Sequence, residues 1–237
     1  DRSTAAEPPN EVLPMKPLTK LLTTVTAAAL VLAGCGKLPT NAAGVRGAKS
    51  VAAQGLGAKV PAGFLWGVST AGYQYEGYDT SSNWAKWDAD GKTVERNTGG
   101  ADGLNRYTQD IELAASLGTN AFRTSIEWSR VEPKEGQIDP QAVAYYHDLL
   151  KQMKGNGQTP IITLHHFSTP QWFNENGGWE NGANAEKFGK WAAVVAKEFG
   201  SDIEYYITHN EPNVYVAGAF LAGAILDSHW FDQKQMD

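Results

Sequence analysis

The chain is predicted to fold as an α/β domain with a parallel sheet, because short apolar runs alternate with longer helical periods along it. The runs, rich in β-branched and aromatic residues as buried strands are, lie at residues 64–68, 120–126, 160–164 and 205–208. A strand and helix order of βαβαβαβ implies a parallel sheet with helices outside it, either doubly wound or closed into a barrel. Since no Gly-x-Gly-x-x-Gly motif follows the first run, a dinucleotide site is not expected.

The intervening segments have the spacing of amphipathic helices. Apolar residues recur every three or four positions over residues 104–117, 143–153 and 188–199. Glycines that are expected to cap the ends of these helices are Gly118, Gly155 and Gly200. The expected N-caps are Asp102, Asp139, which is followed by Pro140 in the first helical position, and Asn184.

Composition narrows the possible partners of this 237-residue chain. The net charge is −6 and no basic stripe appears, so a nucleic-acid partner is not expected. Hydrophobic residues make up 42% of the sequence, which is ample for a packed core. Cys35 is the single cysteine, and this excludes an intrachain disulfide and a cysteine-rich metal site.

The N-terminal residues are predicted to be a secretory signal rather than part of the fold. A short basic segment, residues 15–20, precedes an apolar stretch, residues 21–32, that is too short to span a bilayer. Leu32-Ala33-Gly34-Cys35 then resembles a bacterial lipobox, in which the cysteine is acylated after cleavage. The alternative is a buried helix with a core cysteine.

Three regions follow from this interpretation. Residues 1–34 are an upstream segment with the lipoprotein signal, residues 35–60 are a flexible tether rich in Ala, Gly and Lys, and residues 61–237 are the folded domain. The expected location is the bacterial cell envelope outside the cytoplasm, with a lipid anchor on Cys35.

The segment Thr208-His209-Asn210-Glu211-Pro212 carries the clearest chemical signal. Pro212 lacks an N–H and cannot continue a strand, so Glu211 is expected to project from a strand end. An amide and a carboxylic acid side by side in this position are typical of the proton donor of a glycosidase. The alternative is a surface glutamate in a turn.

Several ordered segments together resemble glycoside hydrolase family 1, the retaining β-glycosidases built on a TIM barrel. The resemblance covers residues 64–223 and includes the following motifs: Phe64-Leu65-Trp66-Gly67-Val68, Gln74-Tyr75-Glu76-Gly77, Phe122-Arg123-Thr124-Ser125-Ile126-Glu127-Trp128-Ser129-Arg130, Thr163-Leu164-His165-His166-Phe167, Gly177-Gly178-Trp179 and Asn210-Glu211-Pro212. It implies that residues 61–237 form the N-terminal half of a (β/α)8 barrel, with about four strand–helix units.

The resemblance also implies roles for five residues. Glu211 would be the general acid/base, and Asn210 would hold the sugar 2-hydroxyl. Gln74 and His166 would bind the outer hydroxyls of the sugar, with a loop glutamine and a core histidine as the alternative. Arg123 would lie beside the nucleophile and keep it ionised, unless it forms a structural salt bridge.

No cofactor and no metal are expected. His165 and His166 are neighbours on a strand, so their side chains point to opposite faces and cannot easily bind one ion. For at least two of the three tryptophans Trp128, Trp172 and Trp179, packing is favoured over stacking on a sugar ring.

The sequence departs from the family's pattern in several places. His209 replaces an apolar or aromatic residue, Phe167 replaces a common tryptophan, and the segment after Ala217 differs enough that it predicts no sugar specificity. The family's nucleophile lies in a Thr-Glu-Asn-Gly motif that these 237 residues do not contain. Retaining hydrolysis needs two carboxylates, so the chain alone is expected to be an inactive fragment.

The resemblance therefore implies hydrolysis of β-O-glycosidic bonds, of the β-glucosidase or β-galactosidase type, with a β-linked oligosaccharide or glycoside as substrate. A half-barrel lipoprotein that binds sugar or protein without hydrolysing it is the alternative. A non-enzymatic scaffold is disfavoured, because polar residues gather at the predicted strand ends.

Overall fold

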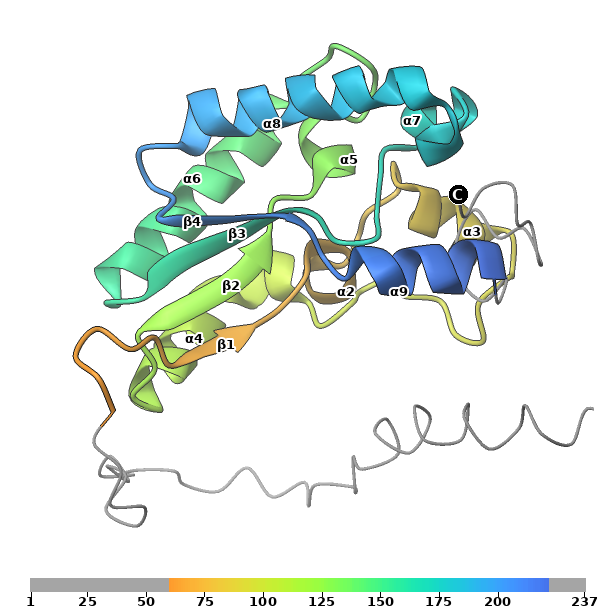
Figure 1. Cartoon of the computed structure of the whole chain (residues 1–237). Helices are drawn as coiled ribbons and strands as arrows, with labels where there is room; N and C mark the ends of the chain where they lie inside the picture. The colour runs from red at the N-terminus through yellow and green to blue at the C-terminus, as the bar shows by residue number, and fades with distance from the viewer. Residues whose placement is uncertain (1–59, 222–237) are drawn as a thin grey trace, which may run out of the picture. The chain divides into compact units, whose positions relative to one another are not determined.

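The computed structural model describes residues 60–221 (Figure 1). The predicted signal segment, Cys35 and the tether up to residue 59 lie outside the described residues, as do residues 222–237. Within the described range, no helix has the length and apolar character that crossing a membrane requires.

Four parallel strands form one sheet in the order β1-β2-β3-β4. Their bounds are β1 Gly67–Ser69, β2 Ala121–Ser125, β3 Thr159–His165 and β4 Tyr205–His209. The first strand begins later than the apolar run 64–68 predicts. Trp66 lies before it, where its N–H donates to the Asn120 side chain (2.7 Å) and its carbonyl accepts from the Asn120 N–H (2.8 Å).

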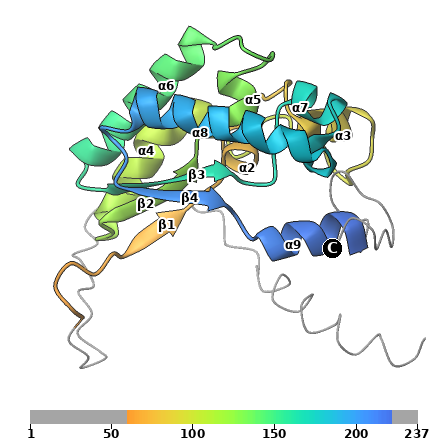
Figure 2. The ribbon, with the colours of Figure 1, turned by 45° about the horizontal axis from the view of Figure 1, so that its top comes forward.

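Three long helices cover one face of this sheet, as Figure 2 shows. They are α4 Gly103–Ser116, α6 Pro140–Gly155 and α8 Ala185–Phe199, and each connects two neighbouring strands. In a doubly wound sheet the strand order reverses and helices lie on both faces. In a barrel the strands are neighbours in sequence order, and the helices lie on the outer face only. The sequential order and single helical layer are those of a barrel segment, so the predicted fold class is confirmed.

The core lies between the sheet and these helices. Phe122, Ile162 and Leu164 from the strands pack against buried side chains of α4, α6 and α8. Trp128 is 1% exposed and stacks on Trp191 with ring centroids 5.7 Å apart. Trp172 and Trp179 are partly buried against the same core. The preference for packing in at least two of the three tryptophans is confirmed.

The helix ends agree with the predicted glycine caps only in part. Gly118 has φ +82° and follows α4 as predicted, in the left-handed conformation that glycine adopts easily. Gly155 is still helical, and the left-handed residue after α6 is Gly157 (φ +71°). Gly200 caps α8 with a right-handed φ of −58°. Gly200 is thus the C-cap residue of α8, as predicted. The prediction for Gly155 was wrong, because apolar spacing alone does not locate the residue at which the chain leaves the helix.

The predicted N-cap residues also agree with the structure only in part. The Asp139 side chain accepts a hydrogen bond from the Gln141 N–H at 2.8 Å, and Pro140 occupies the first turn, as predicted. Asp102 and Asn184 are also N-cap residues, but neither side chain makes a capping hydrogen bond. Asp102 Oδ1 instead accepts from the Tyr78 hydroxyl at 2.9 Å and from the Asn105 side-chain amide at 2.7 Å, so side-chain donors take the place of a backbone N–H.

Short helices that the sequence pattern did not predict fill the loops between the long elements. Their bounds are α2 Gly72–Glu76, α3 Asn83–Ala89, α5 Trp128–Val131, α7 Gln171–Glu175, α9 Pro212–Val216, the 3₁₀ turns η1 Gly178–Glu180 and η2 Gly182–Asn184, and the π-helical turn η3 Ala217–Leu221. These elements have three to seven residues each, which are too few to show a helical period. Most of them follow the carboxyl ends of the strands, where they form the rim around the candidate site.

Candidate active site

The predicted site residues lie within or after four neighbouring strands, towards the carboxyl edge of the sheet. Gln74 is in α2 after β1, Arg123 is in β2, His166 directly follows β3, and Asn210 and Glu211 directly follow β4. Parallel strands place these ends at one edge of the sheet. In β/α barrels this edge carries the active site.

Arg123 connects three strands at this edge. Its Nε donates to Thr163 Oγ1 at 3.1 Å, and its Nη2 lies 3.1 Å from His166 Nδ1 and donates to Asn210 Oδ1 in a short hydrogen bond. Burial lowers the pKa of Arg123, and the charge of nearby Glu211 opposes this shift. The guanidinium thus orders His166 and Asn210 and lies within electrostatic reach of Glu211.

The Arg123 contacts determine what His166 and Asn210 can offer a ligand. A guanidinium only donates, so His166 Nδ1 must accept and the ring hydrogen lies on Nε2. Burial and the charge of Arg123 lower the pKa of His166 to about 4, which keeps the ring neutral near pH 7. Asn210 accepts through Oδ1, so its NH₂ group is left to donate.

Gln74 and His166 line one pocket of about 200 Å³. The rings of Tyr73, Trp84 and Phe167 form part of its wall. Trp84 Nε1 donates to the Phe167 carbonyl at 3.0 Å, which ties the segment after β1 to the segment after β3. Polar groups beside aromatic rings suit a ligand with hydroxyls on its edge and C–H groups on its faces.

The chain turns sharply at Glu211. Asn210 N–H donates to the His165 carbonyl at 2.9 Å, beside the end of the β3–β4 ladder, and Glu211 then adopts φ +43° and ψ +58°. Non-glycine residues rarely adopt this left-handed conformation, which costs free energy and is common at functional sites. Phe167, directly after His166, has φ +67°. Such a turn is needed if Asn210 and Glu211 are both to reach one ligand, because neighbouring residues of a straight strand point to opposite faces.

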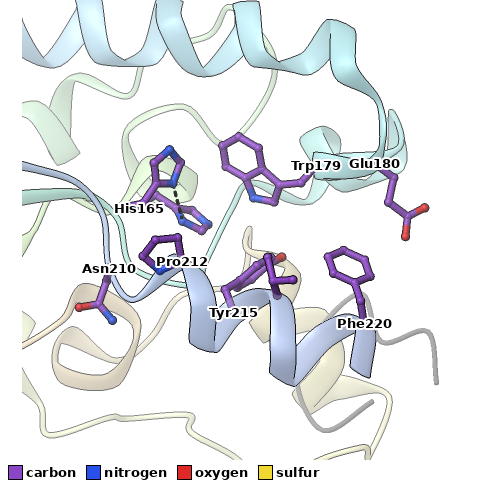
Figure 3. Close-up of a pocket in the computed structure, with 9 residues that line it drawn as sticks. His165, Trp179, Glu180, Asn210, Pro212, Tyr215 and Phe220 are labelled. Atoms are coloured by element: carbon purple, nitrogen blue, oxygen red, sulfur yellow. Dashed lines mark hydrogen bonds between the residues drawn. The ribbon is translucent and has the colours of Figure 1, made fainter. Parts of the chain in front are cut away.

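His165 points to different neighbours from those of His166. Its Nδ1 is 3.3 Å from Nδ1 of His209, a bond drawn as a dashed line in Figure 3, and its ring contacts Trp179 and Tyr215. Burial, with smaller effects of the neighbouring imidazoles, lowers the pKa of His165 to about 3. The rings of His165 and His166 therefore do not converge on one point. Within residues 60–221, no group of three or more His, Cys, Asp or Glu side chains could hold a metal ion.

A second pocket of about 510 Å³ lies beside this histidine pair, between η1 and α9 (Figure 3). Trp179, Pro212, Tyr215 and Phe220 supply most of its apolar wall. The Asn210 side chain also borders this pocket but points away from the paired imidazoles.

Sequence reasoning missed three contributors to the site. Thr163 and Trp84 are ordinary strand and helix residues until the fold brings them to Arg123 and Phe167. His209 was noted only as a departure from the family's pattern. A histidine two positions before Glu211, together with the His165-His166 pair, was the available signal for an imidazole pair across β3 and β4.

The fold and this edge define a class of protein: part of a β/α barrel whose rim brings a guanidinium, an imidazole, an amide and a carboxylic acid together. Comparison with known proteins agrees. The model of Glycosyl hydrolase family 1 matches residues 56–229, and the chain belongs to this family. The predicted family resemblance is thereby confirmed.

Relatives in this family are β-glucosidases from plants and bacteria. The chain is 34% identical over 180 residues to Beta-glucosidase 9 of Arabidopsis thaliana, an alignment that covers 73% of this chain and 36% of the relative. It is 36% identical over 169 residues to Thermostable beta-glucosidase B of Thermobispora bispora, covering 68% and 35%. The chain thus spans about a third of the length of these relatives.

Solved structures give the same result. The β-glycosidase from Pyrococcus horikoshii superposes with a TM-score of 0.70 at 32% identity, over 75% of this chain and 42% of that one. The β-glucosidase from Thermotoga maritima in complex with castanospermine gives a TM-score of 0.67 at 34% identity, over 72% and 41%. The four strands therefore correspond to part of a larger barrel.

Proposed function

We propose that these residues form the sugar-binding and proton-donating half of a retaining β-glycosidase. The observation that carries the proposal is the cluster of Arg123 with His166 and Asn210, directly beside Glu211, at the carboxyl edge of the sheet. The relatives are β-glucosidases, which supports a β-glucoside or a similar β-linked glycoside as substrate.

Glu211 acts as the acid/base in this proposal. It protonates the leaving oxygen in the first step and removes a proton from water in the second. The Asn210 NH₂ group, oriented by Arg123, donates to the sugar 2-hydroxyl. Gln74 and His166 bind outer hydroxyls from the pocket they share, where the neutral imidazole donates through Nε2.

Arg123 has a second role in the proposal, which is to favour the ionised form of a nucleophilic carboxylate beside it. The family's nucleophile motif, Thr-Glu-Asn-Gly, is not present in the 237 residues. Retaining hydrolysis requires two carboxylates about 5–5.5 Å apart. The second carboxylate must therefore come from residues outside this sequence.

The test compares two proteins with aryl β-glycosides as substrates. The chain alone is expected to show no turnover, because no covalent glycosyl intermediate can form on it. A chimera, in which the C-terminal part of the Thermobispora bispora β-glucosidase continues the chain after its family-matched region, is expected to hydrolyse the substrate with retention of the β-configuration. Nuclear magnetic resonance of the first-formed anomer reads out the stereochemistry.

Two outcomes would contradict the proposal. Turnover by the chain alone, undiminished when Glu211 is replaced, would show that another residue carries the chemistry. A folded chimera that binds sugar without hydrolysing it would favour the non-hydrolytic binding module.

We also propose that the protein is a lipoprotein of the bacterial cell envelope, anchored through Cys35 and facing away from the cytoplasm. The proposal rests on the lipobox-like Leu32-Ala33-Gly34-Cys35. Removal of residues 1–34 takes away three basic and three acidic residues, so the net charge stays at −6. Such a charge does not attract the protein to anionic lipid, and attachment must then be covalent.

Replacing Cys35 by serine is expected to release the protein from the membrane fraction. Each acyl CH₂ buried in the bilayer contributes about 0.8 kcal/mol, and one chain anchors only marginally whereas two or more anchor stably. Mass spectrometry of the membrane fraction should find acylated Cys35 at the N-terminus of the unsubstituted protein. Equal membrane retention of Cys35→Ser would overturn the anchor.

A further inference from the structure

Two glutamates of the described part, Glu76 and Glu127, are almost fully buried, at 1% and 3% exposure. Glu76 has a counter-ion. Arg130 Nε donates to its Oε2 at 2.7 Å, and the Tyr146 hydroxyl donates to its Oε1 at 2.8 Å. The second donor of Arg130, Nη2, is taken by the Gly77 carbonyl at 2.7 Å.

Glu127 has no such partner. Its Oε1 accepts a short hydrogen bond from the Ser168 hydroxyl and lies 3.3 Å from Ser129 Oγ. Among residues 60–221, it forms no ion pair with a lysine or arginine. A buried carboxylate without a counter-ion is costly, and such a group usually holds its proton instead.

Ser129 gives the proton a place in a hydrogen-bond chain. Its hydroxyl lies 3.1 Å from Asp79 Oδ2 and 3.3 Å from Glu127 Oε1, yet it has one hydrogen. If Glu127 is protonated, it can donate to Ser129 while Ser129 donates to Asp79. If Glu127 is ionised, two carboxylates compete for that hydrogen and repel each other.

The net effect of the surroundings of Glu127 favours its protonated form. Burial, followed by the negative charge of Asp79, raises the pKa of Glu127 to about 8. The hydrogen bond from Ser168 and the positive charge of Arg130 oppose this rise without cancelling it. The titratable groups that face Glu127 from the elements packed around it are Tyr73 and Glu76 of α2, Asp79 of the following loop, Arg130 of α5 and Tyr146 of α6.

Glu127 also touches the two segments that carry Gln74 and His166. On one side, a Cβ at Gly72 would lie 2.8 Å from Glu127 Oε2, so α2 packs directly on this carboxyl two residues before Gln74. On the other side, Ser168 lies two residues after His166. One buried side chain thus connects the segment after β1 with the segment after β3.

We propose that Glu127 is a positioning residue that, in its protonated form, holds α2 and the segment after β3 in register and so sets the relative placement of Gln74 and His166. The assignment of those two residues to sugar binding rests on the proposed function, but the placement itself does not. Ionisation of Glu127 separates the two segments.

The sign of the pH effect follows from the raised pKa. The stabilisation by protonated Glu127 is fully present below the unfolded value of about 4.5 and declines as pH rises towards the folded value of about 8. The contact between the two segments should therefore weaken between pH 7 and pH 9.

The experiment uses the full chain with Glu127→Gln and Glu76→Gln as a matched pair. Isotope-edited infrared spectroscopy of glutamate-labelled protein should show a protonated carboxyl band that is lost with a midpoint near pH 8 and is absent from Glu127→Gln. Hydrogen exchange of the Gly72–Glu76 and Ser168 amides, normalised to α6, should rise severalfold between pH 7 and pH 9 in the unsubstituted chain.

The two variants should respond in opposite ways. Glutamine mimics the neutral acid, so Glu127→Gln should keep its exchange protection at pH 9. Glu76→Gln should lose protection at every pH, because it leaves Arg130 buried without a counter-ion. Glu127→Ala should lose protection in both segments already at pH 7.

Absence of the infrared band at pH 6, or equal loss of protection in Glu127→Gln and Glu76→Gln at pH 7, would overturn the proposal. Both readouts are independent of sugar binding and turnover. A failure of the proposed glycosidase activity would therefore leave the result for Glu127 unchanged. Likewise, a failure of the proposal for Glu127 would leave the proposed glycosidase activity untouched.

Discussion

Replacing Glu211 by glutamine in the completed chimera is expected to lower kcat/KM for alkyl β-glycosides by about 10²- to 10⁴-fold, the usual contribution of a general acid. Glutamine keeps the size of the side chain and the left-handed turn at position 211, but its amide cannot give a proton to the leaving oxygen. Substrates with an activated aryl leaving group need little protonation and should lose less in the first step. The measurement is initial rates over a series of leaving groups of increasing basicity.

Glu204→Gln is the matched control for this effect. Glu204 is an exposed glutamate just before β4, at the opposite end of the strand from Glu211. Its substitution should leave the rates within about twofold of the parent, as is usual for surface changes. A Glu211→Gln chimera that keeps its full rate on alkyl glycosides, or one that loses the same factor on every leaving group, would refute the acid/base assignment.

A protein that comprises residues 61–237, the predicted folded domain, is expected to self-associate rather than remain monomeric. In the described part, β1 and β4 each pair on one side only, so both sheet edges present free backbone donors and acceptors. Aromatic side chains lie beside these edges: Trp66 is 56% exposed, Tyr205 is 50% exposed and Tyr206 is 42% exposed. Covering a few hundred Å² of such surface contributes roughly 5–10 kcal/mol at about 25 cal/mol per Å².

Sedimentation velocity measures this association, and near-ultraviolet circular dichroism reports whether the aromatic core stays ordered. Tyr205→Lys adds a charge to the β4 edge and should shift the distribution towards smaller species. Leu113→Lys, at a residue that is 61% exposed on α4, is the control and should not. The chimera, in which further strands cover both edges, should be monomeric. A sharp monomeric boundary for the unsubstituted domain, with strong aromatic signals, would show that the half-barrel is stable alone. That result would favour the alternative of a half-barrel that binds sugar or protein without hydrolysing it.

Elements whose signals are local could be predicted from the amino-acid sequence. The three long helices appear where apolar residues recur every three or four positions, since that spacing places one apolar face against the sheet. Asp139 with Pro140 marked the start of α6 correctly, because both act on their own first turn. Asn210-Glu211-Pro212 marked the end of β4, because proline cannot continue a strand ladder.

The arrangement of the strands and the contacts between side chains at their ends depend on the three-dimensional packing of the elements. The alternation of elements allowed a doubly wound sheet or a barrel, and the observed order β1-β2-β3-β4 selects the barrel. Arg123 meets Thr163, His166 and Asn210, which lie 40, 43 and 87 residues further along the chain.

The tautomer of His166, the imidazole pair of His165 and His209, and the uncompensated burial of Glu127 likewise depend on side chains from different elements. A local pattern records which face of an element is apolar and where the chain turns. It does not record which polar groups meet across the sheet, because that depends on how the packed elements approach one another in three dimensions.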